Sequence, residues 1–265
     1  MRKIILAVLL IAATLSAKAW HLNCDKAVLL LASQNYNPQT LQLVHKYIGE
    51  DLTKPAQLFA SLRKDGRYLE TEGWQKLHLD ANLKPAAADE NDAYVQIEKA
   101  LEVLRNRANH DNKSVRFAIY TVMNLVIDMH HISNVAIEGV DKSGTDFQFT
   151  SSKGTANGRP AKLFPFSWKD LWTTRYVYQH GGFTPAMWAS ELNIMFGDKK
   201  AQFSAGTLAD WCGDIGNDTK KVHGVLEANG GQFLHATIQA HEELHMSCLA
   251  RAAYRIAVLL NENLK

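Results

Sequence analysis

The stretch SVRFAIYTVMNLVIDMHH, residues 114–131, decides the fold class. Its apolar residues recur every three or four positions, which predicts a helix over Ser114–His131. The expected buried face consists of Val115, Ala118, Ile119, Val122, Leu125, Val126 and Met129. A second stripe carries Tyr120, Asn124 and Asp128 one helical turn apart, so that these side chains can converge on one point. The segment therefore predicts a core helix that also carries part of a site.

Helical spacing also dominates on both sides of this segment. The expected helices are Lys26–Ser33, Thr40–Ile48, Ala56–Leu62, Tyr94–Leu104, Trp168–Tyr178, Pro185–Phe196, Gly206–Asp214 and a long final one from about Phe233 to Asn261. Asp146–Thr150 alternates like a short strand, and Pro160–Phe166 is expected to pair with it around the turn Lys153–Gly158. No alternation of strands and helices suggests a parallel sheet. The predicted class is mainly α, with one small hairpin.

The first residues have the pattern of a cleavable signal peptide. Arg2 and Lys3 precede an apolar run from Ile4 to Leu15, and Ser16-Ala17-Lys18-Ala19 offers a small-x-small cleavage site. The run is shorter than the roughly 20 residues that a membrane-spanning helix needs. We therefore expect residues 1–19 to be removed, residues 20–265 to form one domain without a membrane span, and the protein to be secreted or periplasmic.

Composition restricts the function only weakly. The formal net charge is +2, which gives no strong attraction toward nucleic acid but leaves room for a local basic groove. Cys24, Cys212 and Cys248 all lie in the expected mature chain. An oxidising compartment permits one disulfide bond among them, and their spacing does not choose the pair.

The run His241-Glu242-Glu243-Leu244-His245 matches the H-E-x-x-H pattern of zinc peptidases. On a helix it would place two imidazoles one turn apart, with Glu242 as general base. Glu262 is the obvious downstream candidate for a third ligand. The competing interpretation is structural, because His241 and His245 lie on a stripe with Leu234, Ile238, Leu249, Ala252, Ile256 and Leu259. We favour two core histidines without a metal.

Several segments taken together resemble the secreted, single-strand-specific zinc nucleases known as the S-one/P-one nuclease family. Trp20 matches the tryptophan that begins the family's mature chain. Ala60–Lys64 and Trp74-Gln75-Lys76 look like its A-S-W-A-D and W-H-Y segments. Asn124–His130 looks like its H-x-x-G-D-I-H helix. Gly144–Phe147, Leu171-Trp172 and Ala252–Asn261 resemble its G-G-N-D-F, L-H-x-x-W-D and final A-G-x-R-L-A-x-L-L-N segments, in the same order.

The resemblance implies the helical fold of zinc-dependent nucleases and phospholipase C, and hydrolysis of single-stranded nucleic acid or nucleotides at three zinc ions. The metal positions would be Trp20, Asp25, Asn124, Asp128 and Asn134. Trp20 and Asp128 keep the family residue, whereas the other three stand where the family has histidine. Family ligands also become Lys64 and Gln75, and the pair on the Trp172 segment becomes Lys169 and Thr173. Amides and protonated lysines are poor zinc ligands.

These replacements predict that zinc is absent or sub-stoichiometric and that catalysis is reduced or lost, as in a pseudoenzyme. The charges of Asp25 and Asp128 would balance those of Lys64 and Lys169 in a metal-free cluster. The first alternative is an active phosphodiesterase with shifted ligands His21, Asp65, His78 and His130. The second is the H-E-x-x-H peptidase. The sequence names no catalytic residue for the favoured interpretation.

Overall fold

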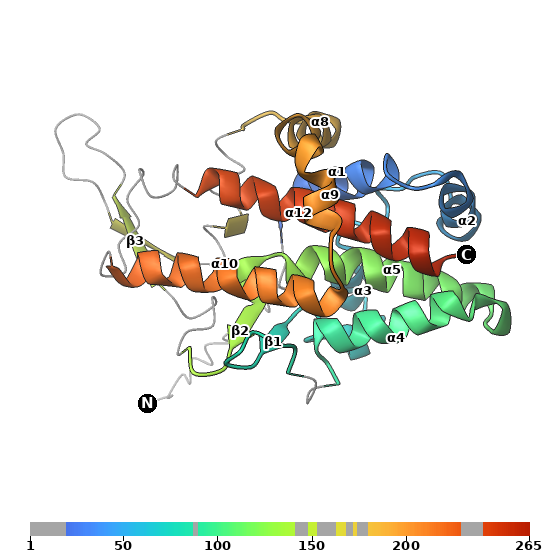
Figure 1. Ribbon diagram of the computed structural model, residues 1–265, viewed down its shortest axis with the longest axis horizontal. Coiled ribbons are helices and arrows are strands. Elements are labelled where there is room, and N and C mark those ends of the chain that lie inside the picture. Colours follow the sequence, from blue (N-terminus) through green and yellow to red (C-terminus); the bar gives the residue numbers. More distant parts are fainter. Residues whose placement is uncertain are drawn as a thin grey trace, which may run out of the picture.

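The protein is mainly helical, as the periodicity predicts (Figure 1). The computed structural model describes residues 20–86, 90–140, 148–152, 163–167, 172–173, 180–228 and 241–265. The expected cleavage site therefore lies outside the described residues, and so does the expected helix Trp168–Tyr178 apart from Trp172 and Thr173.

The described residues of the N-terminal half form five α-helices, close to where the spacing places them. They are α1 (Leu22–Ser33), α2 (Pro38–Ile48), α3 (Leu58–Lys64), α4 (Ala93–Arg105) and α5 (Asn112–Met129). Side chains cap four of them at the N-terminus, because His21, Asn37, Asp92 and Asp111 each accept a hydrogen bond from a main-chain N–H in the first turn of the following helix. The short 3-10 helices η1 (Leu69–Thr71), η2 (Arg107–Asn109) and η3 (Ile132–Asn134) lie between or beside them.

The C-terminal part adds four described helices. They are α8 (Pro185–Phe196), α9 (Lys200–Ser204), which follows the 3-10 turn η5 (Gly197–Lys199), α10 (Leu208–Ala228) and α12 (Glu242–Asn263). The bounds of α8 agree with the prediction. The described part of the final helix begins later than the expected Phe233, and residues 229–240 lie outside the described ranges.

In the described parts of the chain, two small sheets accompany the helices. The expected hairpin is present as β3 (Gln148–Ser152) paired antiparallel with β4 (Leu163–Ser167), with Thr150 opposite Pro165. A second sheet was not predicted: β1 (Leu77–Leu79) pairs in parallel with β2 (Val135–Ile137), with His78 opposite Ala136. The helices α4 and α5 form the connection between these two strands. Three residues per strand are too few to produce a readable alternation.

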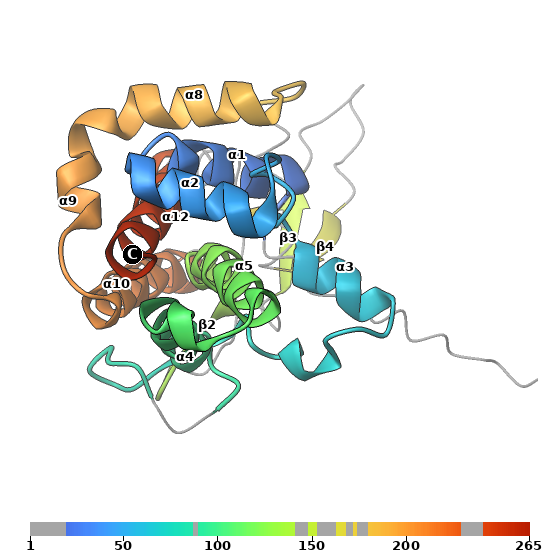
Figure 2. The same cartoon turned by 90° about the vertical axis from the view of Figure 1, so that its right-hand side faces the viewer.

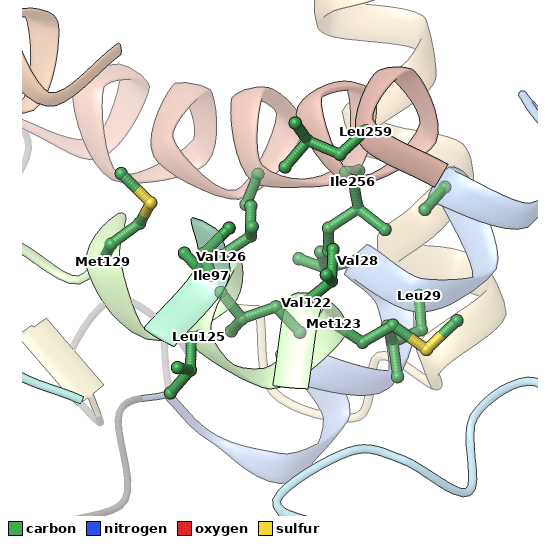
Figure 3. Packing of buried hydrophobic residues seen from close by; sticks show 14 of the residues in the cluster. Val28, Leu29, Ile97, Val122, Met123, Leu125, Val126, Met129, Ile256 and Leu259 are labelled. Atoms are coloured by element: carbon green, nitrogen blue, oxygen red, sulfur yellow. The ribbon is translucent and has the colours of Figure 1, made fainter. Parts of the chain in front are cut away.

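The core lies where α5, α12, α1 and α4 meet. Figure 2 shows α5 surrounded by α12, α4 and the α1–α2 pair, while α8 lies over α1 on the outside. Side chains of all four central helices point toward one another in Figure 3, including Val28, Ile97, Val122 and Ile256. Each of these four is fully buried. Burying this apolar surface supplies most of the driving force that holds the helices together.

Helix α10 has 21 residues, more than twice the length of the expected helix Gly206–Asp214. Gly216 lies inside the helix, where a Cβ atom would stand 2.7 Å from Leu79 Cδ1 and 2.9 Å from Leu83 Cδ2. The missing side chain therefore lets α10 approach β1 and the following turn closely. Here glycine serves helix packing and does not end the helix.

The three cysteines are buried and free. The disulfide bond that the sequence permitted is thus not formed in this structure. Among the described helices, none is long and apolar enough to cross a membrane.

Candidate functional site

Trp20 lies at the centre of the region that the sequence singled out. Its side chain is fully buried, and its indole Nε1 donates a hydrogen bond to the main-chain oxygen of Ile127, at 3.1 Å. Its own main-chain oxygen accepts a hydrogen bond from Gln57 Nε2, at 2.8 Å. Trp20, two residues before α1, is therefore hydrogen-bonded both to the last turn of α5 and to the residue that precedes α3.

Three further rings surround Trp20. The centroids of His131 and His245 lie 4.7 Å and 4.8 Å from that of the indole, both nearly edge-on, and the centroid of Trp172 lies at 6.3 Å. All three are buried. We refer to Trp20, Gln57, His131, Trp172 and His245 as the Trp20 cluster. It joins α1, the end of α5, the start of α12 and the Trp172 segment.

A hydrogen bond to the main chain determines which ring nitrogen of His245 carries the proton. Its Nε2 lies 3.0 Å from the main-chain oxygen of Trp172, and a carbonyl only accepts, so Nε2 carries the proton. Burial is the main cause that lowers the pKa of His245 to about 3. The ring is therefore neutral at neutral pH, with its Nε2 engaged by the protein. His131 likewise contacts two hydroxyls, with Nδ1 2.7 Å from Ser133 Oγ and Nε2 3.2 Å from Thr173 Oγ1.

Three of the five family-equivalent positions lie on α1 and α5, Trp20 belongs to the cluster, and Asn134 ends η3. Asp25 is buried in α1; burial of the neighbouring Cys24 thiol, together with the charge of Asp25, raises the pKa of that thiol. Asn124 is buried in α5, and its Nδ2 donates to the Tyr120 oxygen one turn back, at 2.9 Å.

Asp128 is half-buried one turn further along α5, beside Ile127. Asn134 donates from Nδ2 to the main-chain oxygen of Asp128, at 2.9 Å. The structure thus gathers Trp20, Asp128 and Asn134 at one end of α5, with Asn124 one turn away. Lys64 is exposed at the end of α3, and Lys169 lies outside the described residues.

The four residues proposed as shifted ligands occupy separate places. His21 is exposed and caps α1 by accepting from Asn23 N, at 3.3 Å. Asp65 is exposed after α3 and forms an ion pair with Arg67, at 3.1 Å. His78 lies on β1, with Nδ1 3.0 Å from Asp92 Oδ2. Among the described residues, which include these four, no three His, Cys, Asp or Glu side chains lie close enough together to hold a metal ion.

His130 belongs to a buried network that sequence reasoning missed. Its Nδ1 donates to the Val126 oxygen at 2.7 Å, and its Nε2 accepts from Arg255 Nη1 at 3.0 Å, so both nitrogens are used. Burial, together with the nearby Arg255 and Arg251, holds the pKa of His130 well below its ordinary value.

Arg255 continues the network toward α10. It donates to the Phe203 oxygen at 2.9 Å and to Asp214 Oδ2 at 2.5 Å, and burial lowers its pKa to about 10. One turn earlier on α12, Arg251 pairs with Asp218 of α10. The shared i, i+4 spacing of the two arginines and the two aspartates is the signal that could have revealed this antiparallel contact.

The H-E-x-x-H run lies at the start of α12. His241 precedes the helix and Glu242 opens it, and both His241 and His245 are buried, with exposures of 6% and 0%. Glu242 Oε1 lies 2.6 Å from His180 Nε2. Glu262 is 17 residues from His245 on the same helix, which at 1.5 Å per residue is about 25 Å. Glu262 therefore cannot share a metal ion with His245.

Comparison with known protein families finds no match for this chain. Comparison with curated proteins finds none either.

Proposed function

We propose that this chain is a secreted or periplasmic relative of the single-strand-specific zinc nucleases whose zinc pocket has become a metal-free structural cluster. In this proposal the protein has reduced or no hydrolytic activity, and it acts by binding nucleotides or nucleic acid. The observation that carries the proposal is the hydrogen bond from Gln57 Nε2 to the Trp20 oxygen, at 2.8 Å.

The resemblance implies that the N-terminal Trp binds zinc through its main-chain amine and oxygen, and this hydrogen bond uses a lone pair of that oxygen. A zinc ion needs lone pairs directed toward it, whereas the Gln57 amide directs an N–H donor at the oxygen. The neighbouring His245 supports the same view, because its Nε2–H is committed to the Trp172 oxygen. In the Trp20 cluster, N–H donors of the protein are thus directed at the Trp20 and Trp172 main-chain oxygens, which a cation would otherwise contact.

The changed side chains support the proposal independently. Asn124 and Asn134 stand at two histidine positions of the family, and both donate their amide N–H groups to main-chain oxygens of the α5 segment. Asn134 therefore stabilises the end of α5, and Asn124 bonds within its own helix, at positions where an imidazole would offer a lone pair to a metal ion. The substitutions replace metal coordination with hydrogen bonds within the protein.

Metal analysis of the mature protein tests this proposal. After dialysis against buffer with trace zinc, we expect far less than the three zinc ions of the family, and no chelator-sensitive hydrolysis of single-stranded DNA or nucleotides. N-terminal sequencing of secreted material should find Trp20. Stoichiometric trinuclear zinc with chelator-sensitive hydrolysis would overturn the proposal.

Two variants identify which alternative would replace it. If hydrolysis of nucleotides is present and Asp128→Asn removes it, while Asp51→Asn at an exposed position does not, the chain is an active phosphodiesterase. If a peptidase activity is present and Glu242→Gln removes it, the chain is a zinc peptidase. We expect neither variant to change any measured hydrolysis.

A further inference from the structure

A cavity of about 500 Å³ opens beside α4 and the first half of α5, away from the Trp20 cluster. Tyr68, Trp74 and Phe117 supply its aromatic surface, and Lys99, His110 and Lys113 line it as well. We refer to these six residues as the aromatic groove. Phe117 and Ile127 are ten residues apart on α5, which places the groove about 15 Å along the helix from the contact with Trp20. Its volume is in the range of small-molecule sites.

The aromatic rings of the groove contact one another, one pair stacked and one pair edge-to-face. Tyr68 stacks on Phe117 with centroids 5.1 Å apart and an interplanar angle of 20°. Trp74 meets Phe117 edge-on at 6.1 Å. Tyr68 and Phe117 are only half-buried, so that part of each ring remains accessible to a ligand ring. Flat aromatic surfaces of this kind bind planar rings by stacking.

The backbone holds Tyr68 in place at an energetic cost. Its φ of 53° is in the left-handed region, which is unfavourable for a bulky side chain. The following turn stabilises this conformation, because Thr71 Oγ1 donates to the Tyr68 oxygen at 2.7 Å and Arg63 donates to Thr71 Oγ1 at 2.8 Å. Such strain persists only where surrounding contacts impose it, and it is common at ligand sites.

The charges at the groove favour an anion on the side of α5. Lys99 and Lys113 are exposed and line the groove from α4 and from the first turn of α5. The carboxylate of Asp111 accepts a hydrogen bond from Ser114 N at 2.7 Å, so its charge is directed at the helix N-terminus. Glu70 lines the cavity from the segment that carries Tyr68, where it can accept from donors on a ligand.

We propose that the aromatic groove binds a small planar aromatic ring that carries an anionic group, with the ring on Tyr68 and Phe117 and the anion near Lys99 and Lys113. A nucleoside phosphate and an aromatic carboxylate both have this chemistry. The site shares no residue with the Trp20 cluster, so it does not depend on the nuclease resemblance.

Isothermal titration calorimetry with four probes tests the site. Adenosine 5′-monophosphate and indole-3-acetate carry both a ring and a charge, adenosine carries only the ring, and ribose 5-phosphate only the charge. We expect one or both of the first two to bind, and the last two to bind at least fivefold more weakly. Binding of the nucleotide alone would assign the ligand to nucleotides, and binding of both would assign it to aromatic anions in general. No binding of either at millimolar concentration, or equal binding of adenosine and its monophosphate, would overturn the proposal.

Variants locate the binding in the groove. Tyr68→Asn should weaken binding by roughly 5- to 100-fold, because it removes the stacking ring while asparagine tolerates a positive φ. The double variant Lys99→Gln and Lys113→Gln should weaken binding roughly fivefold or more and reduce its salt dependence. Lys200→Gln, at an exposed position on α9, is the matched control and should bind like the unaltered protein. Circular dichroism melting verifies that each variant is folded, and folded groove variants with unchanged affinity would place the ligand elsewhere.

Discussion

Gln57 and Tyr68 both have a left-handed backbone, with φ values of 56° and 53°, but their side chains have different surroundings. The Gln57 amide donates to the Trp20 oxygen in the Trp20 cluster. The Tyr68 ring stacks on Phe117 at the edge of an open cavity. The Gln57 side chain thus satisfies a main-chain acceptor of the protein. The Tyr68 side chain instead has a half-buried surface that borders the cavity.

The difference separates a structural region from a binding region. Trp20, His131, Trp172 and His245 are buried around one another, and protein atoms form hydrogen bonds with the Trp20 indole, with both His131 nitrogens and with His245 Nε2. The rings of the aromatic groove instead adjoin a cavity of about 500 Å³ with exposed lysines. We therefore expect substitutions in the cluster to change stability and substitutions in the groove to change ligand binding.

Removing the central indole should have the largest effect. Trp20→Ala deletes a fully buried side chain and its hydrogen bond to the Ile127 oxygen, so we expect a loss of about 3–5 kcal/mol in the free energy of unfolding. Urea denaturation followed by circular dichroism measures it. Leu69→Ala, at a side chain with 57% exposure, is the control and should cost less than about 0.5 kcal/mol. A cost below about 1 kcal/mol for Trp20→Ala would show that the cluster is not structural.

Protonation of the cluster should have the next largest effect. The folded pKa of His245, about 3, is below the value of about 6.5 for an unperturbed histidine. The unfolded chain therefore binds a proton that the folded chain does not, and the free energy of unfolding falls as the pH drops below about 6.5. For one such residue, the loss between pH 7 and pH 5 is about 2 kcal/mol.

The variant His245→Gln should reduce this pH dependence, and the slope that remains includes the contribution of His130, whose pKa is also lowered. Urea titrations at several pH values measure it. Thr219→Val, which removes the buried hydrogen bond to the Ile215 oxygen without removing a titrating group, should lower stability equally at all pH values. An unchanged slope in His245→Gln would mean that folding does not lower the pKa of this ring.

The sequence predicted most helices because their burial pattern is local. The apolar stripe of Ser114–His131 became α5, and Pro185–Phe196 became α8 with the expected bounds. It did not predict the continuation of α10, because the packing of Gly216 on Leu79 and Leu83 depends on contacts with distant parts of the chain. For the same reason it missed the pairing of β1 with β2, which are joined only through α4 and α5.

The candidate site was predicted in part for a similar reason. The stripe of Asn124 and Asp128 follows from helical spacing. In the structure, Asp128 is next to Ile127, whose main-chain oxygen accepts the hydrogen bond from Trp20. The partner of His130 could not be predicted, because Arg255 lies 125 residues away. The aromatic groove was missed as well, since a positive φ at Tyr68 has no signature in composition or periodicity.

Substitutions of Gln57 should have an intermediate effect on the free energy of unfolding. Comparing alanine with glycine at this position isolates the cost of its positive φ. Gln57→Ala leaves the buried Trp20 oxygen without its donor and keeps a Cβ atom at positive φ, so we expect a cost of about 1–3 kcal/mol. Gln57→Gly loses the same hydrogen bond but relieves the strain. The glycine variant should therefore be more stable than the alanine variant by roughly 0.5–1 kcal/mol in urea denaturation. A glycine variant less stable than the alanine variant would contradict a left-handed Gln57.

Tyr68 should show the smallest effect on stability, even though its replacement is expected to weaken ligand binding most. Tyr68→Asn loses a stacked pair worth about 0.5–1.5 kcal/mol and gains relief from an unfavourable φ of similar size, so the net change should stay within about 1 kcal/mol. Tyr68→Ala also removes the ring but keeps the unfavourable φ without asparagine's tolerance for it, and should be less stable than Tyr68→Asn. Urea denaturation of both variants without ligand makes the comparison. A loss above about 3 kcal/mol in Tyr68→Asn would place the ring in the core, and the distinction between a structural cluster and a binding groove would then fail, because both strained residues would serve folding alone.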